Sequence, residues 1–495
     1  MRNRILAIAS LLLGWWVPPI ADAVETRPNV LFIVCDDLNT HVSSSGYGPI
    51  HTPAFDHLAS EGMTFSRAYC QYPVCGPSRA SFLHGLYPES TGVLDNKSDI
   101  REVRPGTVSL PQRFKQAGYW TGAVGKVFHN VSADPGDVAW HQTLRFENDE
   151  MPFVTPIREA FEKKHGSVAT GKTRRLWREE YASLATQTRG QNVGYGPSGL
   201  KDEQHKDGKN ARQVVEWLRK ESFEDKPFFI ACGIQKPHVP FLAPDKYFEL
   251  YPRESLKFSL TPSDFWKQAP KSAMVKRYEG FGFEFGVEND ELRRDYMQAY
   301  HACISFLDAQ IGLVLQTLQE AGHWDDTIVV LTSDHGYQLG EHFMWGKVTL
   351  FEVCDRVPFV VRVPAQVGDA ATIPGSQSDG LVELVDLYPT LAELCSVEAP
   401  QDLQGKSLVP MLRDPKAPGK QVAYTVVSRG DKLGKAIRHQ HWRYARWPTG
   451  EELYDLKSDP EEFVNLASNP VHSSTLTWMR QLLSEAETNA ESQRR

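Results

Sequence analysis

Two short clusters of acidic and imidazole side chains each follow an apolar run of about strand length. The adjacent carboxylates Asp36 and Asp37 follow one run, and the pair Asp334 and His335 follows another. Carboxylate oxygens favour hard cations such as calcium or magnesium, whereas zinc favours more nitrogen and sulfur ligands. An Asp-Asp pair alone is most often an ordinary turn, but four such groups after two strands indicate a divalent-cation site.

Cationic side chains and histidines form a second set of candidates. The residues of this set are Arg79, Lys126, His129, Lys236, His238 and Lys347. Lysine binds anionic oxygens as a point charge and arginine binds them as a planar fork, while histidine can protonate a leaving group near neutral pH. A divalent cation beside several such groups suits a tetrahedral oxyanion whose charge grows in the transition state.

The nucleophile is harder to identify from residue types. No Gly-x-Ser-x-Gly elbow is present, and no Ser/His/Asp order presents itself. Cys75 is the best candidate, because seven cysteines leave at least one without a disulfide partner. A soft thiolate is nevertheless a poor match for a hard cation, so the residues alone leave this mismatch open.

Four uninterrupted apolar runs predict strands that are buried on both faces of a sheet. These runs are Val30 to Cys35, Pro227 to Ala231, Thr327 to Thr332 and Val357 to Val363. Helix-like stretches such as Leu292 to Ala321 lie between them, which predicts an α/β fold with a mostly parallel central sheet flanked by helices. Ligands bind at the carboxyl ends of strands in such sheets, so we expect the polar residues after the first three runs to converge.

The length of 495 residues predicts one large domain and a smaller one. We expect a catalytic domain over residues 24–375 and a C-terminal subdomain over residues 376–495, with a helix at 381–395 and then an antiparallel sheet. Residues 141–208, which are charged, and residues 253–289, which are aromatic, resemble insertions over this scaffold. Long loops at the active edge of a sheet often carry binding residues, and plain surface decoration explains them equally well.

The N-terminus predicts an exported protein. Residues 1–23 have a positive start, a short apolar core and an Ala-Asp-Ala end, the pattern of a signal peptide cleaved near Ala23. The apolar core is too short to span a membrane, so we expect a secreted or periplasmic protein without stable membrane insertion. With 54 basic and 62 acidic residues, the net charge of −8 argues against nucleic acid as a partner but leaves room for a local basic pocket.

The stretch from Cys75 to Arg79, with Leu83 and Gly85 after it, resembles the signature of the type I sulfatases of the alkaline phosphatase superfamily. The resemblance extends from Pro28 almost to the C-terminus. It also rests on the Asp36-Asp37 pair, Gly125-Lys126-x-x-His129, Thr332 to Gly336, Lys347 and Glu452 to Leu456. Within the family, the segments Lys236 to Phe241 and Leu339 to His342 are most similar to the iduronate-2-sulfatase branch.

The resemblance implies a modified nucleophile. In this family a formylglycine-generating enzyme oxidises the signature cysteine, so Cys75 would become an aldehyde. One hydroxyl of its hydrate, a gem-diol, binds calcium and attacks sulfur, and the other later loses its proton and expels sulfate. An oxygen nucleophile then faces a hard cation, which removes the mismatch. The family usually has threonine where this chain has His84, but the Cys-x-Pro-Ser-Arg core is intact, so we expect maturation.

The resemblance also assigns roles to the other candidates. The implied ligands of one calcium ion are Asp36, Asp37, modified Cys75, Asp334 and His335. Arg79 would orient the hydrate, and Lys126 with Lys347 would hold the sulfate oxygens. His129 would assist proton loss from the hydrate. His238 would protonate the leaving alcohol, and Lys236 would contact an anionic sugar.

The expected function is therefore hydrolysis of a sulfate ester on a sulfated carbohydrate. The first alternative is a phosphodiesterase or phosphonate monoester hydrolase of the same superfamily, which phosphate release from model aryl esters would distinguish. The second is an exported glycan-binding protein without catalysis. A decayed site would have lost ligands or its nucleophile, whereas this sequence keeps all of them.

Overall fold

The computed structural model describes residues 27–131, 133–169, 171–187, 194–220, 223–275 and 289–494. The predicted signal peptide lies outside these residues. So do four aromatic residues of the second predicted insertion, Tyr278, Phe281, Phe283 and Phe285.

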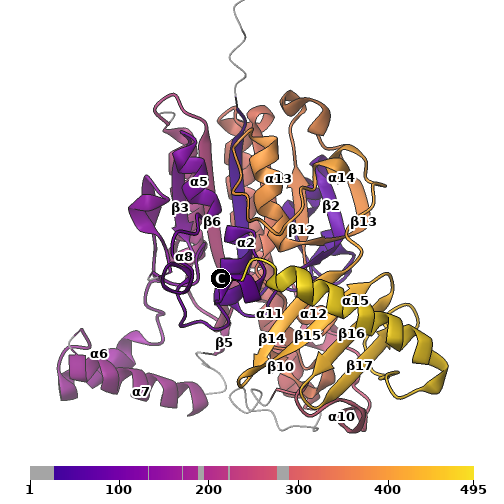
Figure 1. Cartoon of the computed structure of the whole chain (residues 1–495). Helices are drawn as coiled ribbons and strands as arrows, with labels where there is room; N and C mark the ends of the chain where they lie inside the picture. The colour runs from indigo at the N-terminus through magenta and orange to yellow at the C-terminus, as the bar shows by residue number, and fades with distance from the viewer. Residues whose placement is uncertain are drawn as a thin grey trace, which may run out of the picture.

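A nine-stranded sheet forms the centre of the molecule (Figure 1). Its strand order is β11-β2-β12-β8-β1-β6-β3-β4, with β13 also paired to β2. The strands are β1 (Asn29–Asp36), β2 (Met63–Tyr69), β3 (Trp120–Gly125), β4 (Gln142–Leu144), β6 (Phe228–Pro237), β8 (Thr327–Ser333), β11 (Arg356–Val357), β12 (Phe359–Arg362) and β13 (Ser376–Glu383).

The central strands β8, β1, β6, β3 and β4 run parallel to one another. This arrangement confirms the predicted mostly parallel sheet and places the carboxyl ends of four neighbouring strands at one edge. The fourth predicted run, Val357 to Val363, splits into β11 and β12, and β12 runs antiparallel to β8. An apolar run reveals burial on both faces, but it does not encode strand direction.

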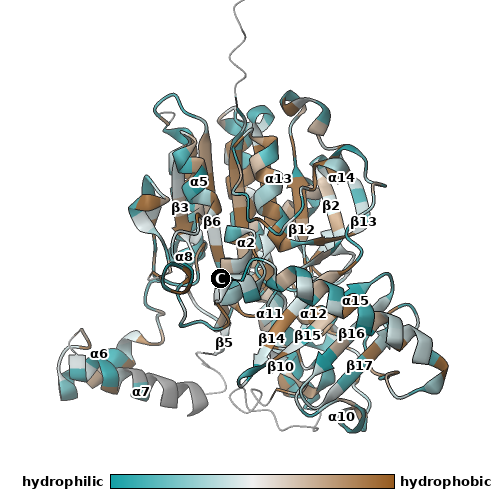
Figure 2. Cartoon of the chain, in the orientation of Figure 1, coloured by the Kyte–Doolittle hydropathy of each residue, from teal (hydrophilic) through white to brown (hydrophobic). Residues whose placement is uncertain are grey.

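Helices cover both faces of this sheet, as the side-chain pattern of β1 requires. Leu31, Ile33 and Cys35 belong to one apolar core, and the alternate residues of β1 belong to the other. The first core packs on α1 (Pro53–Glu61), α8 (Lys206–Arg219) and α11 (Asp290–Glu320). The second packs on α2 (Cys75–His84), α5 (Leu110–Gln116), α13 (Leu387–Leu394) and α14 (Val409–Arg413). The strands are accordingly the most hydrophobic part of the molecule (Figure 2).

The long helix α11 confirms the helix predicted at Leu292 to Ala321. Its start is capped by Asn289, whose side chain accepts a hydrogen bond from the backbone N–H of Leu292. By length and composition it could cross a membrane, but 78% of its most apolar window is buried inside the protein. Its apolar side chains therefore serve the core of the molecule.

A second sheet forms the C-terminal part, as predicted. It is four-stranded and antiparallel, and α15 (Ser473–Glu491) packs against it. Its strands are β14 (Ala423–Arg429), β15 (Lys432–His439), β16 (Trp442–Trp447) and β17 (Gly450–Asp455). The boundary proposed after residue 375 precedes β13, which still pairs with β2 in the large sheet.

The predicted helix at 381–395 is partly wrong. Residues 381–383 end strand β13, and α13 begins only at Leu387. Glu383 and Asp386 cap the 3₁₀ turn between them through reciprocal side-chain contacts, so the chain turns before the helix starts.

The first predicted insertion supplies several elements. It begins with the edge strand β4 and continues into α6 (Thr155–His165) and α7 (Gly171–Gln187), which Figure 1 shows at the lower left, apart from the sheet. It then returns through β5 (Tyr195–Pro197), which pairs with β7 (Phe241–Ala243). In the second predicted insertion the structure shows α10 (Phe265–Gln268). The remaining short elements are α3 (Pro88–Thr91), α4 (Ile100–Val103), α9 (Asp245–Phe248), α12 (Glu352–Asp355), β9 (Gln338–Leu339) and β10 (Trp345–Gly346).

Candidate active site

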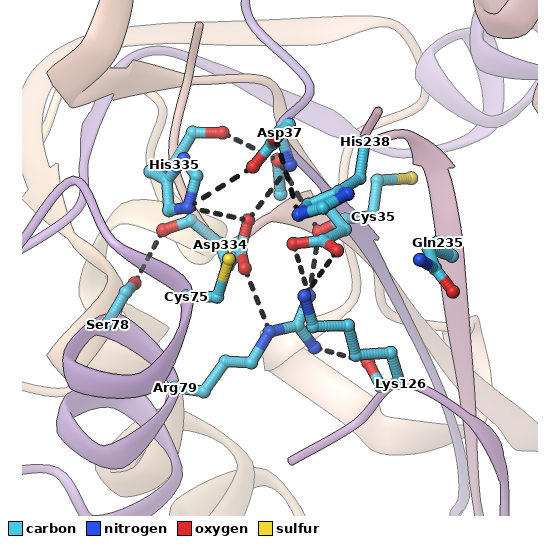
Figure 3. A network of polar contacts seen from close by, with 12 residues as sticks. Cys35, Asp37, Cys75, Ser78, Arg79, Lys126, Gln235, His238, Asp334 and His335 are labelled. Carbon is cyan, nitrogen blue, oxygen red and sulfur yellow. Dashed lines mark hydrogen bonds and ion pairs between the residues drawn. The ribbon is translucent and has the colours of Figure 1, made fainter. Parts of the chain in front are cut away.

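The carboxyl ends of four parallel strands bring the predicted residues together (Figure 3). Asp36 ends β1, Lys126 follows β3, His238 follows β6 and Asp334 follows β8. The N-terminus of α2 enters the same space from the other side and adds Cys75 and Arg79. Residues far apart in the sequence thus meet at the sheet edge, as predicted.

Backbone strain directs the two adjacent carboxylates into the site. Asp37 has a φ of 66°, a left-handed conformation that costs free energy for a residue other than glycine. Tyr300 on α11 stabilises this turn, because its hydroxyl donates to the Asp37 carbonyl at 2.6 Å and accepts the N–H of Asn39 at 3.0 Å. The N–H of Leu38 donates to the Ser333 hydroxyl at 3.0 Å. Neighbouring elements therefore hold the turn.

The donor set fits a hard divalent cation. One ligand atom each from Asp36, Asp37, Cys75 and His335 lies within 4.8 Å of all the others. Among the described residues, Asp36 Oδ1, Asp37 Oδ2 and His335 Nε2 are buried and make no hydrogen bond. Buried polar atoms rarely stay unsatisfied without a reason. A bound cation would satisfy all three.

His335 presents its Nε2 atom to the other members of this donor set. Its Nδ1 donates to the Gly336 carbonyl at 2.9 Å, because a carbonyl can only accept. This bond leaves Nε2 with its lone pair directed at the carboxylates, 3.5 Å from Asp37 Oδ1. Burial would lower the pKa of His335, but the carboxylate of Asp334 outweighs it and raises this pKa.

Asp334 differs from the other predicted ligands in its contacts. Its Oδ2 accepts from Arg79 Nε at 2.8 Å, and its Oδ1 accepts the N–H of Asp37 at 3.2 Å. Burial raises its pKa to about 6, with Arg79 and His335 opposing. Asp334 therefore links the cation site to Arg79.

Cys75 lies at the first residue of α2, where helix geometry favours an anion. The preceding Val74 provides no side-chain cap, and Asn96 takes this role by accepting the N–H of Gly76 at 2.8 Å. Burial would raise the pKa of the Cys75 thiol, but Lys347 and Lys126 outweigh it and lower this pKa well below the ordinary value. Lys347 Nζ lies 2.9 Å from its sulfur.

Two lysines flank this position with their ammonium groups on carboxylates. Lys126 Nζ lies 2.5 Å from Asp36 Oδ2, and Lys347 pairs with Asp37. Burial and the Cys75 thiolate would raise the pKa of Asp36, yet Lys126 and other nearby cations lower it. Both lysines therefore remain charged beside the sulfur, where they can also reach an anionic ligand.

Arg79 is buried to 1% exposure and joins three strands to α2. It donates to the carbonyls of Lys126 and Val127, and its Nη2 lies 3.6 Å from Asp36 Oδ1. With Asp334 on its other edge, the guanidinium is fully engaged by the protein. It thus orients the residues around Cys75.

Two histidines face the same sulfur. His129 and His238 both interact with Cys75 and help to lower the pKa of its thiol. His238 Nδ1 donates to the Val239 carbonyl at 2.7 Å, so Nε2 is the atom that faces the site, 4.0 Å from Asp37 Oδ2. Burial opposes, but Asp37 and Asp36 raise the pKa of His238 to about 9. His238 is therefore protonated at neutral pH and can donate.

Lys236 is the predicted site residue that the structure does not bring into this group. It is buried, and its ammonium donates to the Pro240 carbonyl at 2.5 Å. Burial lowers its pKa, with Cys303 of α11 and Asp207 opposing. Its ammonium thus serves the segment that carries His238.

Sequence patterns gave no signal for the residues that support the site. Asp207, at the start of α8, accepts the N–H groups of Gln235 and Lys236 at 2.8 Å each and fixes the end of β6. Tyr300 and Ser333 hold the turn after Asp36. A buried polar residue within a helical apolar pattern is the one hint that Asp207 and Tyr300 offer.

Comparison with known proteins agrees with the fold and this geometry. Residues 28–397 match the family described as Sulfatase, and residues 340–489 match the family described as N-sulphoglucosamine sulphohydrolase, C-terminal. A Formosa agariphila protein named Sulfatase is 34% identical over 469 residues, covering 92% of this chain and 86% of the relative. Human iduronate 2-sulfatase is 30% identical over 536 residues, covering 95% of this chain and 92% of the relative.

Solved structures show the same fold. The phosphonate monoester hydrolase of Agrobacterium radiobacter aligns with a TM-score of 0.73 at 22% identity, over 94% of this chain and 96% of the other. On this fold, the protein carries a buried donor set that fits a divalent cation, with two lysines beside it. The chain belongs to the sulfatase family of the alkaline phosphatase superfamily, and it is an enzyme of the sulfuric ester hydrolase class.

Proposed function

We propose that this sulfatase releases sulfate from a sulfated sugar with a formylglycine derived from Cys75 and one calcium ion. The observation that carries the proposal is the position of Cys75, which lies among three buried ligand atoms without hydrogen bonds. Oxygen donors predominate in this set, and they favour calcium over zinc. We name Asp36, Asp37 and His335 as ligands, with Asp334 completing the set.

Formylglycine would supply, in its hydrated form, an oxygen nucleophile where the Cys75 sulfur now lies. Lys126 and Lys347 would bind the oxygens of the sulfate group, because their ammonium groups flank this position. Placing fixed cations where negative charge develops lowers the barrier without reorganisation. Arg79 would hold α2 and Asp334 in register during turnover.

Proton transfer falls to the two histidines. His238 Nε2 would donate its proton to the alkoxide oxygen that leaves when the sulfur–oxygen bond breaks. The neighbouring carboxylates of Asp37 and Asp36 favour the protonated form of His238 that this role requires. His129 would accept the proton of the hydrate hydroxyl, because it also interacts with Cys75.

The sugar would be of the kind that iduronate 2-sulfatase acts on, given the shared segments Lys236 to Phe241 and Leu339 to His342. Buried Lys236 would favour such a substrate indirectly, by holding the segment that carries His238. The positive start and apolar core of residues 1–23 support export of the mature protein. A formylglycine-generating enzyme would be its partner during maturation.

Paired ester assays test the reaction class. Protein co-produced with a formylglycine-generating enzyme is assayed with an aryl sulfate, an aryl phosphate diester and an aryl phosphonate ester. We expect sulfate release to exceed phosphorus-ester cleavage, and Cys75→Ala to abolish it while leaving the melting curve intact. Preferential cleavage of the phosphorus esters would replace the proposal by the phosphonate hydrolase alternative. Binding of a sulfated sugar without any turnover would support the glycan-binding alternative.

A further inference from the structure

Helices α6 and α7 form a projecting arm, which we call the basic arm (Thr155–Gln187). Figure 1 shows it apart from the layers that cover the sheet. Phe161 joins the two helices, with its ring centroid 5.2 Å from that of Trp177 and 4.7 Å from that of His165. Seventeen residues make α7 about 25 Å long. The arm is therefore a packed helical hairpin.

The tip of the basic arm, residues 163–175, carries only positive charge. It contains no aspartate or glutamate, although the whole chain has a net charge of −8. Its basic residues, all exposed, are Lys163, Lys164, Lys172, Arg174 and Arg175. This concentration of one sign is complementary to a polyanion.

Helix stability explains only some of these charges. Lys163 and Lys164 end α6, where cations suit the helix dipole, and Arg175 forms an ion pair with Glu179 one turn further along α7. Lys172 and Arg174 begin α7, where cations oppose the helix dipole. The first turn of α7 holds no acidic residue in compensation. A placement that weakens the helix indicates a role for the charge outside folding.

Gly194, the first described residue after the basic arm, is hydrogen-bonded to the segment that carries His238. After α7 the chain reaches β5, which runs parallel to β7, and the N–H of Phe241 donates to the Gly194 carbonyl at 2.9 Å. Only Val239 and Pro240 separate Phe241 from His238. The chain therefore returns from the basic arm to the segment that carries His238.

Building on the proposed function, we infer that the basic arm binds sulfate groups of a polymeric sulfated glycan, whose reacting ester enters the site. The tip lies outside the catalytic group, so it contributes binding without touching the reacting atoms. Several weak charge contacts along one chain add up to useful affinity and fall steeply with salt. A small sulfate ester is too short to use them.

Competition against a small substrate tests this role. Heparin serves as the probe and inhibits turnover of an aryl sulfate. In a variant with Lys163, Lys164, Lys172 and Arg174 all changed to Gln, we expect about tenfold weaker heparin inhibition at low salt. Aryl sulfate turnover and inhibition by inorganic sulfate should stay unchanged.

Two controls accompany this variant. A matched surface variant changes Lys406, Lys416, Lys432 and Lys457, which are exposed elsewhere, to Gln. A charge-preserving variant of the tip has Lys163, Lys164 and Lys172 changed to Arg, and both controls should behave as the unaltered protein does. Equal heparin inhibition of the Gln tip variant and the unaltered protein would overturn the inference. Binding of the unaltered protein to phosphatidylserine vesicles but not to heparin would also overturn it. So would a Gln tip variant that differs from the unaltered protein only in oligomeric mass.

Failure of the proposed function is distinguishable from failure of this inference. Retention of the protein on immobilised heparin is measured without turnover, as the salt concentration that elutes the protein. If the unaltered protein shows no sulfate ester turnover but the Gln tip variant is retained less on heparin, the proposed reaction is refuted. The inference that the basic arm binds a sulfated glycan is then still supported. If the protein turns over the sulfate ester but the Gln tip variant is retained as strongly as the unaltered protein, the reaction is supported and the role of the basic arm is refuted.

Discussion

Two buried ionic clusters in this molecule differ in how completely their polar atoms are satisfied. In the cluster of Glu383, Asp386 and Lys420, each carboxylate oxygen accepts at least one hydrogen bond. In the active site, Asp36 Oδ1, Asp37 Oδ2 and His335 Nε2 are buried without a hydrogen bond. Both clusters bear the cost of burying charge, but only the second leaves atoms directed at a shared space. Complete pairing indicates a structural role, and convergent unsatisfied atoms indicate a ligand.

The largest difference between the clusters should appear on changing Asp37→Asn. We expect aryl sulfate turnover to fall about a thousandfold, because charge stabilisation of several kcal/mol depends on the metal. Calcium should also lose its ability to raise the melting temperature, a linkage effect of about 2.7 kcal/mol at a hundred times Kd. Both are measured on matured protein after chelation and calcium addition. Unchanged stabilisation by calcium would remove Asp37 from the ligand set.

The paired cluster should respond to mutation in the opposite way. Lys420→Met leaves Glu383 and Asp386 buried without their cation, so we expect unfolding free energy to fall by about 3–5 kcal/mol. The catalytic constants of the folded protein should not change. Denaturant unfolding and steady-state kinetics check both, with Lys420→Arg as the control. A catalytic defect in fully folded Lys420→Met would show that the two clusters do not differ in role.

Substitution of Tyr300 should have an effect of intermediate size, because Tyr300 contacts the backbone of the proposed ligand Asp37 and not the metal. Tyr300→Phe removes the hydrogen bonds at the strained Asp37 turn, and we expect calcium affinity to fall about tenfold. Calorimetric titration of metal-free protein measures the affinity. Tyr337→Phe is a control, because the two rings stack with centroids 5.9 Å apart. If both variants bind calcium as the unaltered protein does, the turn needs no support from α11.

The smallest effect concerns protonation of His238. Its pKa is raised from the ordinary 6.5 to about 9 in the metal-free protein, where burial is outweighed by Asp37 and Asp36. The protonated side chain therefore adds stability that is complete below pH 6.5 and is lost as the pH rises through 9. Calcium neutralises both carboxylates, so it should lower this pKa. Histidine NMR titration with and without calcium, assigned with His238→Gln, measures the change. A pKa of His238 that calcium leaves constant would place the metal elsewhere.

The sequence predicted those features of the fold that depend on one property of a single segment, such as its hydrophobicity. Apolar runs ending in Asp36, His238 and Asp334 predicted parallel strands and a shared edge, because strand ends that carry polar groups must face solvent or a site. The direction of β12 and the strand character of residues 376–383 were not predictable in this way. Pairing partners determine them, and β13 contains polar residues and a glycine that weaken any periodic pattern.

The supporting residues were also beyond sequence patterns. Lys236 lies two residues from His238, yet its side chain points to Pro240 because the strand alternates its faces and the chain then turns back. Asp207 and Tyr300 reach the site from α8 and α11, and their contacts depend on how these helices pack on the sheet. Such packing has no local signature.

The mass of the tryptic peptide Ala68 to Arg79 tests the central claim most directly. It is measured on protein co-produced with a formylglycine-generating enzyme, alongside sulfate release by the same preparation. The account predicts an aldehyde at Cys75, a thiol at the internal control Cys70, and activity that rises with the aldehyde fraction. Both residues are buried cysteines in the structure, so selective conversion cannot follow from exposure in the folded state. Full sulfatase activity with both thiols intact would contradict the account.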